Sequence, residues 1–354
     1  MNKTCFLLHA YSPKNSGDGL LVELSIELIN QSRDYAKIYV VCLDKQGFIG
    51  KNYGYENVEF VSVLELALKT PRLLRDKTSF DIYGVGGGYL RAPDFKVGLK
   101  TFLAHGSQMV WKKFFSTKKI YFPQSVGPFT SFWLPVFSWL LKDNNVVFLR
   151  DNKSIQELDG LENTLRTPDL VANKIIKKFC GSDFSRNQKE NIYFVFRDIP
   201  AEKGRSSYLH KISELIKRFP DSKLALQSVG RGNSDDNFYA DYFKEYSKEI
   251  VPMAKVLMDP KALVVSVRLH GSLEAILSNV PSIHIAYERK GFAAYEDLGI
   301  KEYCHHVSSF DVDIVASQIE SLLNNIEPYS LLLEHACRKG KNVDINMNIS
   351  KVLA

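Results

Sequence analysis

Residues 266–290 carry the sequence SVRLHGSLEAILSNVPSIHIAYERK, which has the pattern of a strand, a helix and a second strand. The apolar run 262–267 predicts a buried strand that ends just before Arg268. A short helix is predicted over 271–278, because an asparagine and then a proline follow it, as is typical of a helix end. The second apolar run, 282–286, predicts another buried strand, so this part of the chain is expected to form a βαβ unit of a parallel sheet.

Charged side chains follow both of these predicted strands. Arg268 and His270 come just after the first strand, and Lys290 comes shortly after the second. Because ligands of open α/β sheets bind outside the carboxyl ends of the strands, these three side chains are expected to surround an anionic ligand. The alternative for each residue alone is structural: Arg268 would pair with a carboxylate, and His270 would cap the turn. The occurrence of all three at consecutive strand ends favours a binding site.

Apolar strands continue to alternate with helical segments along the rest of the chain, beginning with a predicted strand at 4–9. The predicted fold class is α/β, with two Rossmann-like domains facing a cleft, because 354 residues are long for a single core. A polar segment at 177–190 predicts an exposed linker. The expected domains are therefore an N-terminal one over 1–180, a C-terminal one over 190–325, and a closing helix over 326–354.

Composition narrows the class of protein. The net charge of +6 comes without a run of Lys and Arg, so nucleic acid is not expected as a partner. The five cysteines are scattered without a CxxC pair, which favours a reduced compartment and argues against a structural zinc site. The first residues lack the features of a signal peptide, and no apolar stretch is long enough to span a bilayer. These observations favour a cytoplasmic enzyme.

Polar or glycine-rich clusters also follow the predicted strands of the N-terminal half. None of them is specific alone: Asp18 would cap a helix or act as a base, and the glycines would form a tight turn or admit a ligand close to the backbone. The spacings GxGxxG and GxxxxGK[ST] are absent, so neither a dinucleotide site nor a P-loop is indicated. The informative feature is that all of these clusters follow predicted strands. The clusters are Asn15-Ser-Gly-Asp-Gly19, Gly86-Gly-Gly88, Gln124-Ser125 and Arg150-Asp151.

Together these motifs resemble the polysaccharide pyruvyl transferase family. The resemblance implies a glycosyltransferase-B-like pair of Rossmann-type domains. It also implies that phosphoenolpyruvate donates a pyruvyl group to two hydroxyls of a sugar, as a cyclic ketal, in the synthesis of bacterial-type surface polysaccharide or exopolysaccharide. The motifs that carry it are Asn15-x-Gly-Asp18, Gly86-Gly-Gly-Tyr-Leu90, Gln124-Ser-Val-Gly-Pro128, Arg150-Asp-x-x-Ser154, Pro168-Asp169, Arg268-Leu-His270, Pro281 and Tyr287-x-x-Lys290.

This chemistry suggests roles for residues of both domains. Phosphoenolpyruvate carries a carboxylate and a phosphate, so the C-terminal domain is expected to bind it through Arg268, Lys290 and Arg197. His270 is the expected acid/base, and Asp18 is the expected base toward the acceptor hydroxyl. No metal and no cofactor beyond this co-substrate is expected. The acceptor is a sugar, an oligosaccharide or a lipid-linked unit, and the N-terminal domain is expected to contact it through Asn15, Gly87, Gly88, Gln124, Ser125 and Arg150.

Two other functions remain open. A nucleotide-sugar-dependent glycosyltransferase of the same fold would also use basic residues in its second domain. A non-catalytic carbohydrate-binding protein would retain the fold alone. For Arg197 the structural alternative is a surface salt bridge with Asp198 or Glu202.

The segment 129–141, FTSFWLPVFSWLL, is dense in aromatic and apolar residues. It is too short to span a bilayer, and a buried helix is the simpler interpretation. The alternative is an interfacial patch, because Trp and Phe favour the boundary between lipid and water. That alternative predicts peripheral membrane contact, with the enzyme at the inner membrane face if its acceptor is lipid-linked.

Overall fold

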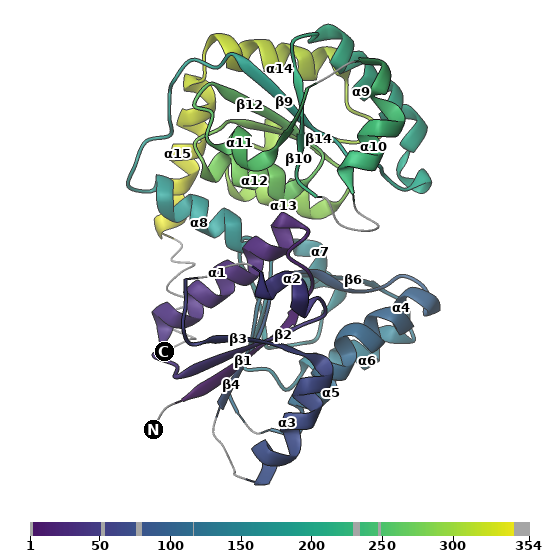
Figure 1. Cartoon of the computed structure of the whole chain (residues 1–354), viewed down its shortest axis with the longest axis vertical. Helices are drawn as coiled ribbons and strands as arrows, with labels where there is room; N and C mark the ends of the chain where they lie inside the picture. Colours follow the sequence, from purple (N-terminus) through teal and green to yellow (C-terminus); the bar gives the residue numbers. More distant parts are fainter. Residues whose placement is uncertain are drawn as a thin grey trace. The chain divides into compact units, whose positions relative to one another are not determined.

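The computed structural model describes residues 3–50, 54–75, 80–115, 117–228, 234–246 and 249–342. These residues form two compact units, which divide between Leu170 and Val171 (Figure 1). Each unit contains one parallel sheet with helices packed against it. The predicted α/β fold with two Rossmann-like domains is therefore confirmed.

The first unit is built on a parallel sheet in the order β3-β2-β1-β4-β6-β7-β8, with β5 paired to β6. Its central strands are buried along their whole length, as expected for a parallel sheet covered by helices. The strand order reverses direction between β1 and β4, and ligands of open α/β sheets bind at such a switch point. The strands are β1 (Thr4–Ala10), β2 (Lys37–Cys42), β3 (Val58–Ser62), β4 (Phe80–Gly84), β5 (Gly87–Ala92), β6 (Lys119–Phe129), β7 (Val146–Leu149) and β8 (Thr164–Arg166).

Several helices of the first unit begin at polar residues that cap them. The side chains of Asn15, Asp94 and Asp151 each accept a hydrogen bond from a backbone amide in the first turn of the helix that follows. One turn of π-helix, η1 (Phe102–Gly106), joins α4 to α5. The helices are α1 (Ser16–Ser32), α2 (Lys45–Ile49), α3 (Val63–Arg75), α4 (Phe95–Thr101), α5 (Ser107–Lys112), α6 (Trp133–Leu141) and α7 (Asn152–Glu157).

The second unit repeats this plan with a parallel sheet in the order β11-β10-β9-β12-β13-β14, whose switch point lies between β9 and β12. Its strands are β9 (Asn191–Val195), β10 (Lys223–Leu226), β11 (Ile250–Pro252), β12 (Ala262–Ser266), β13 (Ser282–Ala286) and β14 (Cys304–His306). Its helices are α8 (Leu170–Phe179), α9 (Arg205–Arg218), α10 (Asp235–Tyr242), α11 (Met253–Leu257), α12 (Leu269–Leu277), α13 (Arg289–Asp297), α14 (Val312–Asn324) and α15 (Glu327–Asn342).

The βαβ unit predicted around residues 262–286 is confirmed. Strands β12 and β13 run parallel, and α12 connects them. The helix begins two residues before the predicted start, because Arg268 has the extended backbone of an N-cap. Asn279 follows the helix with a φ of 64°, the left-handed conformation in which many helices end.

The polar segment 177–190 is less independent than the sequence suggests. Most of its side chains are exposed, but Phe184 is buried and packs on Phe179 and Tyr329. Lys189 is also buried, and its ammonium donates to a backbone carbonyl of the second unit. The division between the units falls earlier, at the start of α8, so this segment lies against the second unit.

The chain ends, as far as it is described, in helix α15. This helix buries Tyr329, Leu333 and Cys337 in the second unit. Residues 343–354 of the predicted closing segment lie outside the described residues. In the described ranges no helix combines the length and the apolar character that crossing a membrane requires.

Candidate active site

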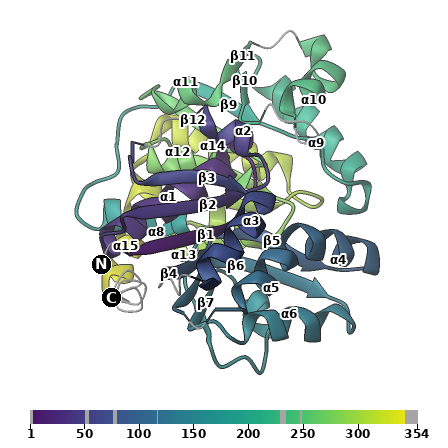
Figure 2. The same ribbon diagram turned by 60° about the horizontal axis from the view of Figure 1, so that its bottom comes forward.

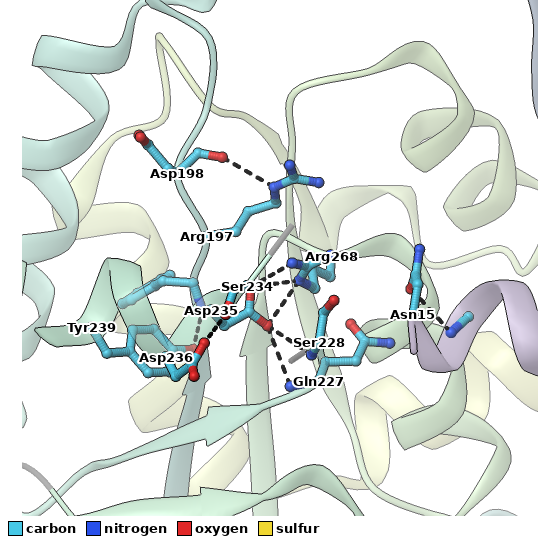
Figure 3. A network of polar contacts seen from close by, with 12 residues as sticks. Asn15, Arg197, Asp198, Gln227, Ser228, Ser234, Asp235, Asp236, Tyr239 and Arg268 are labelled. Carbon is cyan, nitrogen blue, oxygen red and sulfur yellow. Dashed lines mark hydrogen bonds and ion pairs between the residues drawn. The ribbon is translucent and has the colours of Figure 1, made fainter. Parts of the chain in front are cut away.

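Arg268 lies at the switch point of the second unit. Arg268 is buried and follows β12, and its guanidinium forms a two-point ion pair with Asp235, the first residue of α10 (Figure 3). Nε lies 2.9 and 3.0 Å from the two carboxylate oxygens, and Nη2 lies 2.5 Å from Oδ1. Asp235 Oδ2 also accepts from the backbone amides of Gln227 and Ser228. The guanidinium is thus fixed in position before any ligand binds.

This pairing corresponds to the structural alternative for Arg268, in which it binds a carboxylate. Removing one partner of such a buried pair typically costs about 3–5 kcal/mol. The sequence contains no signal for the partner, because Asp235 lies on a different helix of the second unit. An anion at this edge would therefore meet an oriented guanidinium whose charge is partly balanced.

His270 lies in the first turn of α12 and is half-buried. The N-cap of this helix is Arg268, so His270 belongs to the helix itself rather than capping the turn. Gly271 follows because a Cβ there would lie 2.7 Å from Gln227 Oε1. The N-cap side chain makes no capping hydrogen bond, and the start of α12 therefore presents backbone amides of the kind that bind phosphate and carboxylate groups.

Arg197 and Lys290 lie at the neighbouring strand ends. Arg197 follows β9, and its Nη1 donates to the Tyr287 hydroxyl at 3.0 Å while the guanidinium lies 5.4 Å from the tyrosine ring centre. Its Nε donates to the backbone carbonyl of Asp198, whose carboxylate pairs instead with Arg205. The alternative of an Arg197–Asp198 salt bridge is therefore wrong. The side chain of Glu202, the other proposed partner, lies outside the described residues.

Lys290 is the second residue of α13, and its ammonium lies 2.7 Å from the carboxylate of Glu288. Glu288 is the N-cap of that helix but accepts no capping hydrogen bond. Strands β9, β12 and β13 are neighbours in the sheet, so Arg197, Arg268, His270 and Lys290 all follow adjacent strand ends. The second unit thus has basic residues after adjacent strands at one edge of its sheet, as the sequence predicts.

A buried histidine beneath this edge was not expected from the sequence. His284 Nδ1 lies 2.8 Å from the carbonyl oxygen of Ser266 and 3.2 Å from the Ser272 hydroxyl. Burial, opposed by the Ser266 hydrogen bond and assisted by the charges of Lys290 and His270, lowers the pKa of His284 to about 4. The only sequence signal is that His284 interrupts the apolar strand SIHIA. The imidazole is therefore neutral at pH 7, and its contacts connect β13 to the end of β12 and to α12.

In the first unit, Asn15 and Asp18 form the start of α1. The Asn15 side chain accepts from the Gly17 amide at 3.3 Å and donates to Asp18 Oδ2 at 3.0 Å. Asn15 is therefore the cap, which was one of the roles considered for Asp18. Asp18 is half-buried in the first helical turn, where the helix dipole favours its negative charge.

The three glycines after β4 were expected to form a loop, but Gly87 and Gly88 begin β5, and close packing requires the absence of side chains. A Cβ on Gly86 would lie 2.6 Å from the carbonyl oxygen of Pro123, and Gly87 has a φ of 151°. A Cβ on Gly88 would lie 3.2 Å from Arg150 Nη2. Side chains are thus excluded at Gly86 and Gly87, and the loop backbone lies directly beside the β6 and β7 strand ends.

Ser125 and Arg150 are engaged within the protein. Arg150 is buried, and its guanidinium contacts Asp169 Oδ2 at 2.5 Å and the Ser125 hydroxyl at 2.9 Å. Ser125 in turn donates to Asp151 Oδ2 at 2.6 Å. This network joins the middle of β6 to the end of β7, so in the described structure both residues hold these two strands together.

Gln124 differs from these neighbours. Its side chain is fully buried, and neither the amide oxygen nor the amide nitrogen has a hydrogen-bond partner among the described residues. A buried amide without partners costs stability unless a ligand or water completes it. Gln124 is therefore the acceptor-side residue whose geometry most favours ligand binding.

A cluster of buried aromatic side chains at the end of β1 was missed. His9 has a φ of 72°, its amide donates to Gln108 Oε1 at 2.9 Å, and its Nε2 lies 2.8 Å from the Tyr121 hydroxyl. The rings of Tyr89 and His105 pack against it. Burial lowers the pKa of His9 well below its usual value and lowers that of His105 to about 4. A left-handed backbone at a non-glycine residue, which the sequence does not reveal, is the sign of a special site.

No group of three or more metal-ligating His, Cys, Asp or Glu side chains comes together in the described part of the chain.

Comparison with known proteins places the chain in a family. A family model described as polysaccharide pyruvyl transferase matches residues 15–289, which is more than half of the chain. In sequence, no curated protein matches it.

Solved structures share its fold. A glycosyltransferase from Rickettsia africae has a TM-score of 0.57 and 11% identity, with 100% of this chain and 99% of that chain covered. UDP-GlcNAc 2-epimerase from Neisseria meningitidis, bound to UDP-GlcNAc, has a TM-score of 0.52 and 11% identity, with 98% and 99% covered. At this identity the likeness concerns the fold alone, which is of the glycosyltransferase-B type.

Proposed function

The chain belongs to the polysaccharide pyruvyl transferase family, and from this premise we propose that it transfers the pyruvyl group of phosphoenolpyruvate to two hydroxyls of a sugar as a cyclic ketal. The observation that carries the proposal is the set of basic residues at the switch point of the second unit. Arg197, Arg268 and Lys290 follow three adjacent strands, and His270 lies between them in the chain. The proposed setting is the synthesis of a surface polysaccharide or exopolysaccharide.

The donor has two anionic groups, and this edge of the sheet offers two kinds of partner for them. Guanidinium groups suit the bidentate recognition of carboxylate and phosphate, and Arg268 is already oriented by Asp235. The amides at the start of α12 and α13 suit phosphate oxygens. We assign Arg268, Arg197 and Lys290 to phosphoenolpyruvate on this basis.

His270 is assigned the proton transfers. It donates a proton to the methylene carbon of phosphoenolpyruvate, which leaves C2 electron-deficient. One acceptor hydroxyl oxygen then bonds to C2 and loses its proton, for which Asp18 in the first unit is the assigned base. The bond between C2 and the phosphate-ester oxygen breaks, phosphate leaves, and the second hydroxyl oxygen takes its place. The two hydroxyl protons balance the one gained by carbon and the one that leaves with phosphate.

The acceptor is assigned to the switch point of the first unit. Gln124 offers an unpaired donor and acceptor, which matches the two-way hydrogen bonding of a sugar hydroxyl. Gly87 and Gly88 keep side chains away from the same edge, and Asn15 lies at the start of α1. Ser125 and Arg150 are assigned a supporting role, because their hydrogen bonds to Asp151 and Asp169 hold Gln124 in place.

A second candidate is a nucleotide-sugar-dependent glycosyltransferase. It is favoured by the structural neighbours, one of which has UDP-GlcNAc bound. The same amides and cations would then face a diphosphate. The identity of the donor separates the two functions.

The test is phosphate release from phosphoenolpyruvate with a panel of sugar acceptors, followed by mass spectrometry of the products. A product heavier than the acceptor by about 70 Da, expected for a pyruvyl group held by two new C–O bonds after loss of phosphate, would support the proposal. Turnover of a nucleotide sugar without any reaction of phosphoenolpyruvate would favour the glycosyltransferase. Binding of sugars without turnover of either donor would favour a non-catalytic carbohydrate-binding protein.

A further inference from the structure

The charge of this protein is concentrated in one segment. Residues 95–142 contain seven lysines and no Asp or Glu, whereas the whole chain has 46 Lys and Arg against 40 Asp and Glu. This segment alone therefore carries more positive charge than the net +6 of the entire chain. It forms α4, η1, α5, β6 and α6, and Figure 2 shows the three α-helices together on one side of the first unit.

Large apolar side chains project from the same helices. Phe95, Leu99 and Leu103 repeat every four residues along α4 and η1, and they are 61%, 42% and 67% exposed. Phe132, which precedes α6, is 58% exposed, and its ring centre lies 5.7 Å from that of Phe95. These four side chains are the apolar part of a surface that we call the α4–α6 face.

The core beneath this face is tightly packed. Trp133 is buried against Phe95 and Phe102, and Gly98 has no side chain because a Cβ would overlap the indole ring. The helix predicted in segment 129–141 begins at Trp133 and is buried on one side only. Phe132, which precedes it, and Trp139 are exposed. The exposed apolar residues are held on a rigid base and are available for contact.

The exposed charged residues on the helices of this face are lysines, and Asp94 and Asp143 lie at its two ends in the sequence. Lys96 and Lys100 are exposed on α4 between the apolar residues, and Lys142 is exposed at the end of α6. Two further lysines of the segment, Lys112 and Lys119, are buried and bind Asp143 at 2.6 Å, so they do not contribute to the surface. The acidic residue beside the face is Asp94, which caps α4.

We propose that the α4–α6 face docks this protein onto the surface of an anionic phospholipid bilayer. Aromatic and leucine side chains flanked by lysines are the pattern of helices that lie in a membrane interface. A protein partner fits less well, because lysine is depleted from protein–protein interfaces. Each lysine near an anionic surface strengthens binding, and the apolar side chains add burial in the headgroup region. The proposal is independent of the identity of the donor.

The test is flotation of the full-length protein with vesicles of phosphatidylcholine, with and without phosphatidylglycerol. We expect flotation with the anionic vesicles only, and a loss of it at high salt. Phe95→Ser/Leu103→Ser/Phe132→Ser should weaken binding by about tenfold or more, and Lys96→Gln/Lys100→Gln by about tenfold. These side chains are exposed, so each variant should keep the circular dichroism and unfolding midpoint of the wild type.

The matched control is Leu64→Ser/Leu68→Ser on α3, where both leucines are about 80% exposed but outside the face. This variant should float like the wild type. The proposal is overturned if the wild type does not float with anionic vesicles, or if the triple serine variant floats equally well. It is also overturned if the wild type is a dimer that the triple variant converts to a monomer, since the face would then belong to a second copy of the chain.

Discussion

The switch points of the two units share a topology and differ in chemistry. In the second unit the strand ends carry Arg197, Arg268 and Lys290, with His270 half-buried among them. In the first unit the corresponding edge is sealed by glycines and neutral buried side chains, and its one buried cation of note, Arg150, is paired with Asp169. The same sheet plan therefore carries a set of cations at one edge, whereas at the other edge the cation Arg150 is balanced by Asp169.

This difference teaches which ligand each unit suits. Anions need cations and helix amides, which the second unit supplies. A hydroxyl group both donates and accepts hydrogen bonds, and an amide side chain supplies one partner of each kind. The unpaired amide of Gln124 fits that need. The reaction we propose joins one anionic substrate to one neutral substrate, which corresponds to this division.

The largest effect should come from the charged edge. His270→Gln removes the assigned proton donor, and turnover should fall by about 10²–10⁴-fold. Stabilisation by phosphoenolpyruvate in a thermal-shift assay should persist, because Arg197, Arg268 and Lys290 remain. His210→Gln, an exposed histidine of α9, is the matched control and should retain full turnover. Wild-type turnover in His270→Gln would remove this residue from the mechanism.

The second-largest effect should come from Gln124 in the first unit. Gln124→Met should lower turnover by about 10²-fold through weaker acceptor binding, yet raise the free energy of unfolding by roughly 1 kcal/mol, because an unpaired buried amide is lost. Gln108→Met is the contrasting variant, since that buried amide is hydrogen-bonded at both ends, and it should lower stability instead. Chemical denaturation and acceptor titrations measure both quantities. A marked loss of stability in Gln124→Met would mean that its amide is paired.

Acid should destabilise both units in the same way, despite their different edges. His284 in the second unit and His105 in the first have pKa values lowered to about 4. The unfolded chain therefore binds more protons between about pH 6.5 and 4, and stability is lost as the pH falls through this window. Between pH 7 and 5 each histidine should cost about 2 kcal/mol.

Denaturant titrations at pH 7 and pH 5 check this expectation. The difference should shrink in His284→Gln and be unchanged in His210→Gln, whose side chain is exposed. Equal stability of the wild type at the two pH values would show that the buried histidines are not neutral in the folded protein.

The smallest effect concerns the orientation of one cation. Tyr287→Phe removes the hydroxyl that accepts from Arg197 and should raise the KM for phosphoenolpyruvate about fivefold, with kcat little changed. Tyr242→Phe is the control, because Tyr242 makes the same type of contact with Arg205. An unchanged KM in Tyr287→Phe would separate Arg197 from donor binding.

The sequence predicts the repeated pattern and misses the long-range contacts. The βαβ unit at 262–286 could be predicted, because apolar runs and helix-end residues are local signals. The partner of Arg268 could not, since Asp235 reaches it only through the tertiary fold. The burial of Phe184 against Tyr329, which holds segment 177–190 on the second unit, could not be predicted for the same reason. Local sequence patterns encode helices and strands, whereas ion pairs between distant residues and the burial of side chains depend on the tertiary structure.

The site shows the same limit. Gln124 was expected to follow a strand but lies inside β6, and Gly87 and Gly88 were expected in a loop but begin β5. The complete burial of Gln124 could not be predicted either. His9 looks like an ordinary residue of the first strand, and only the structure shows that its backbone is left-handed, one residue before the strand ends. Arg150 follows β7 as expected and Ser125 lies inside β6, and the hydrogen bonds of both side chains are made within the protein.

The left-handed backbone of His9 has a consequence for engineering this protein. Glycine would adopt that conformation without cost, whereas a residue with a Cβ pays about 1–2 kcal/mol there. Replacing His9 with glycine would relieve this strain, but it would leave a cavity beside Tyr89 and His105 and remove the contact with Tyr121. A library of substitutions at this position, selected once for heat resistance and once for turnover, would reveal whether the imidazole serves stability or activity.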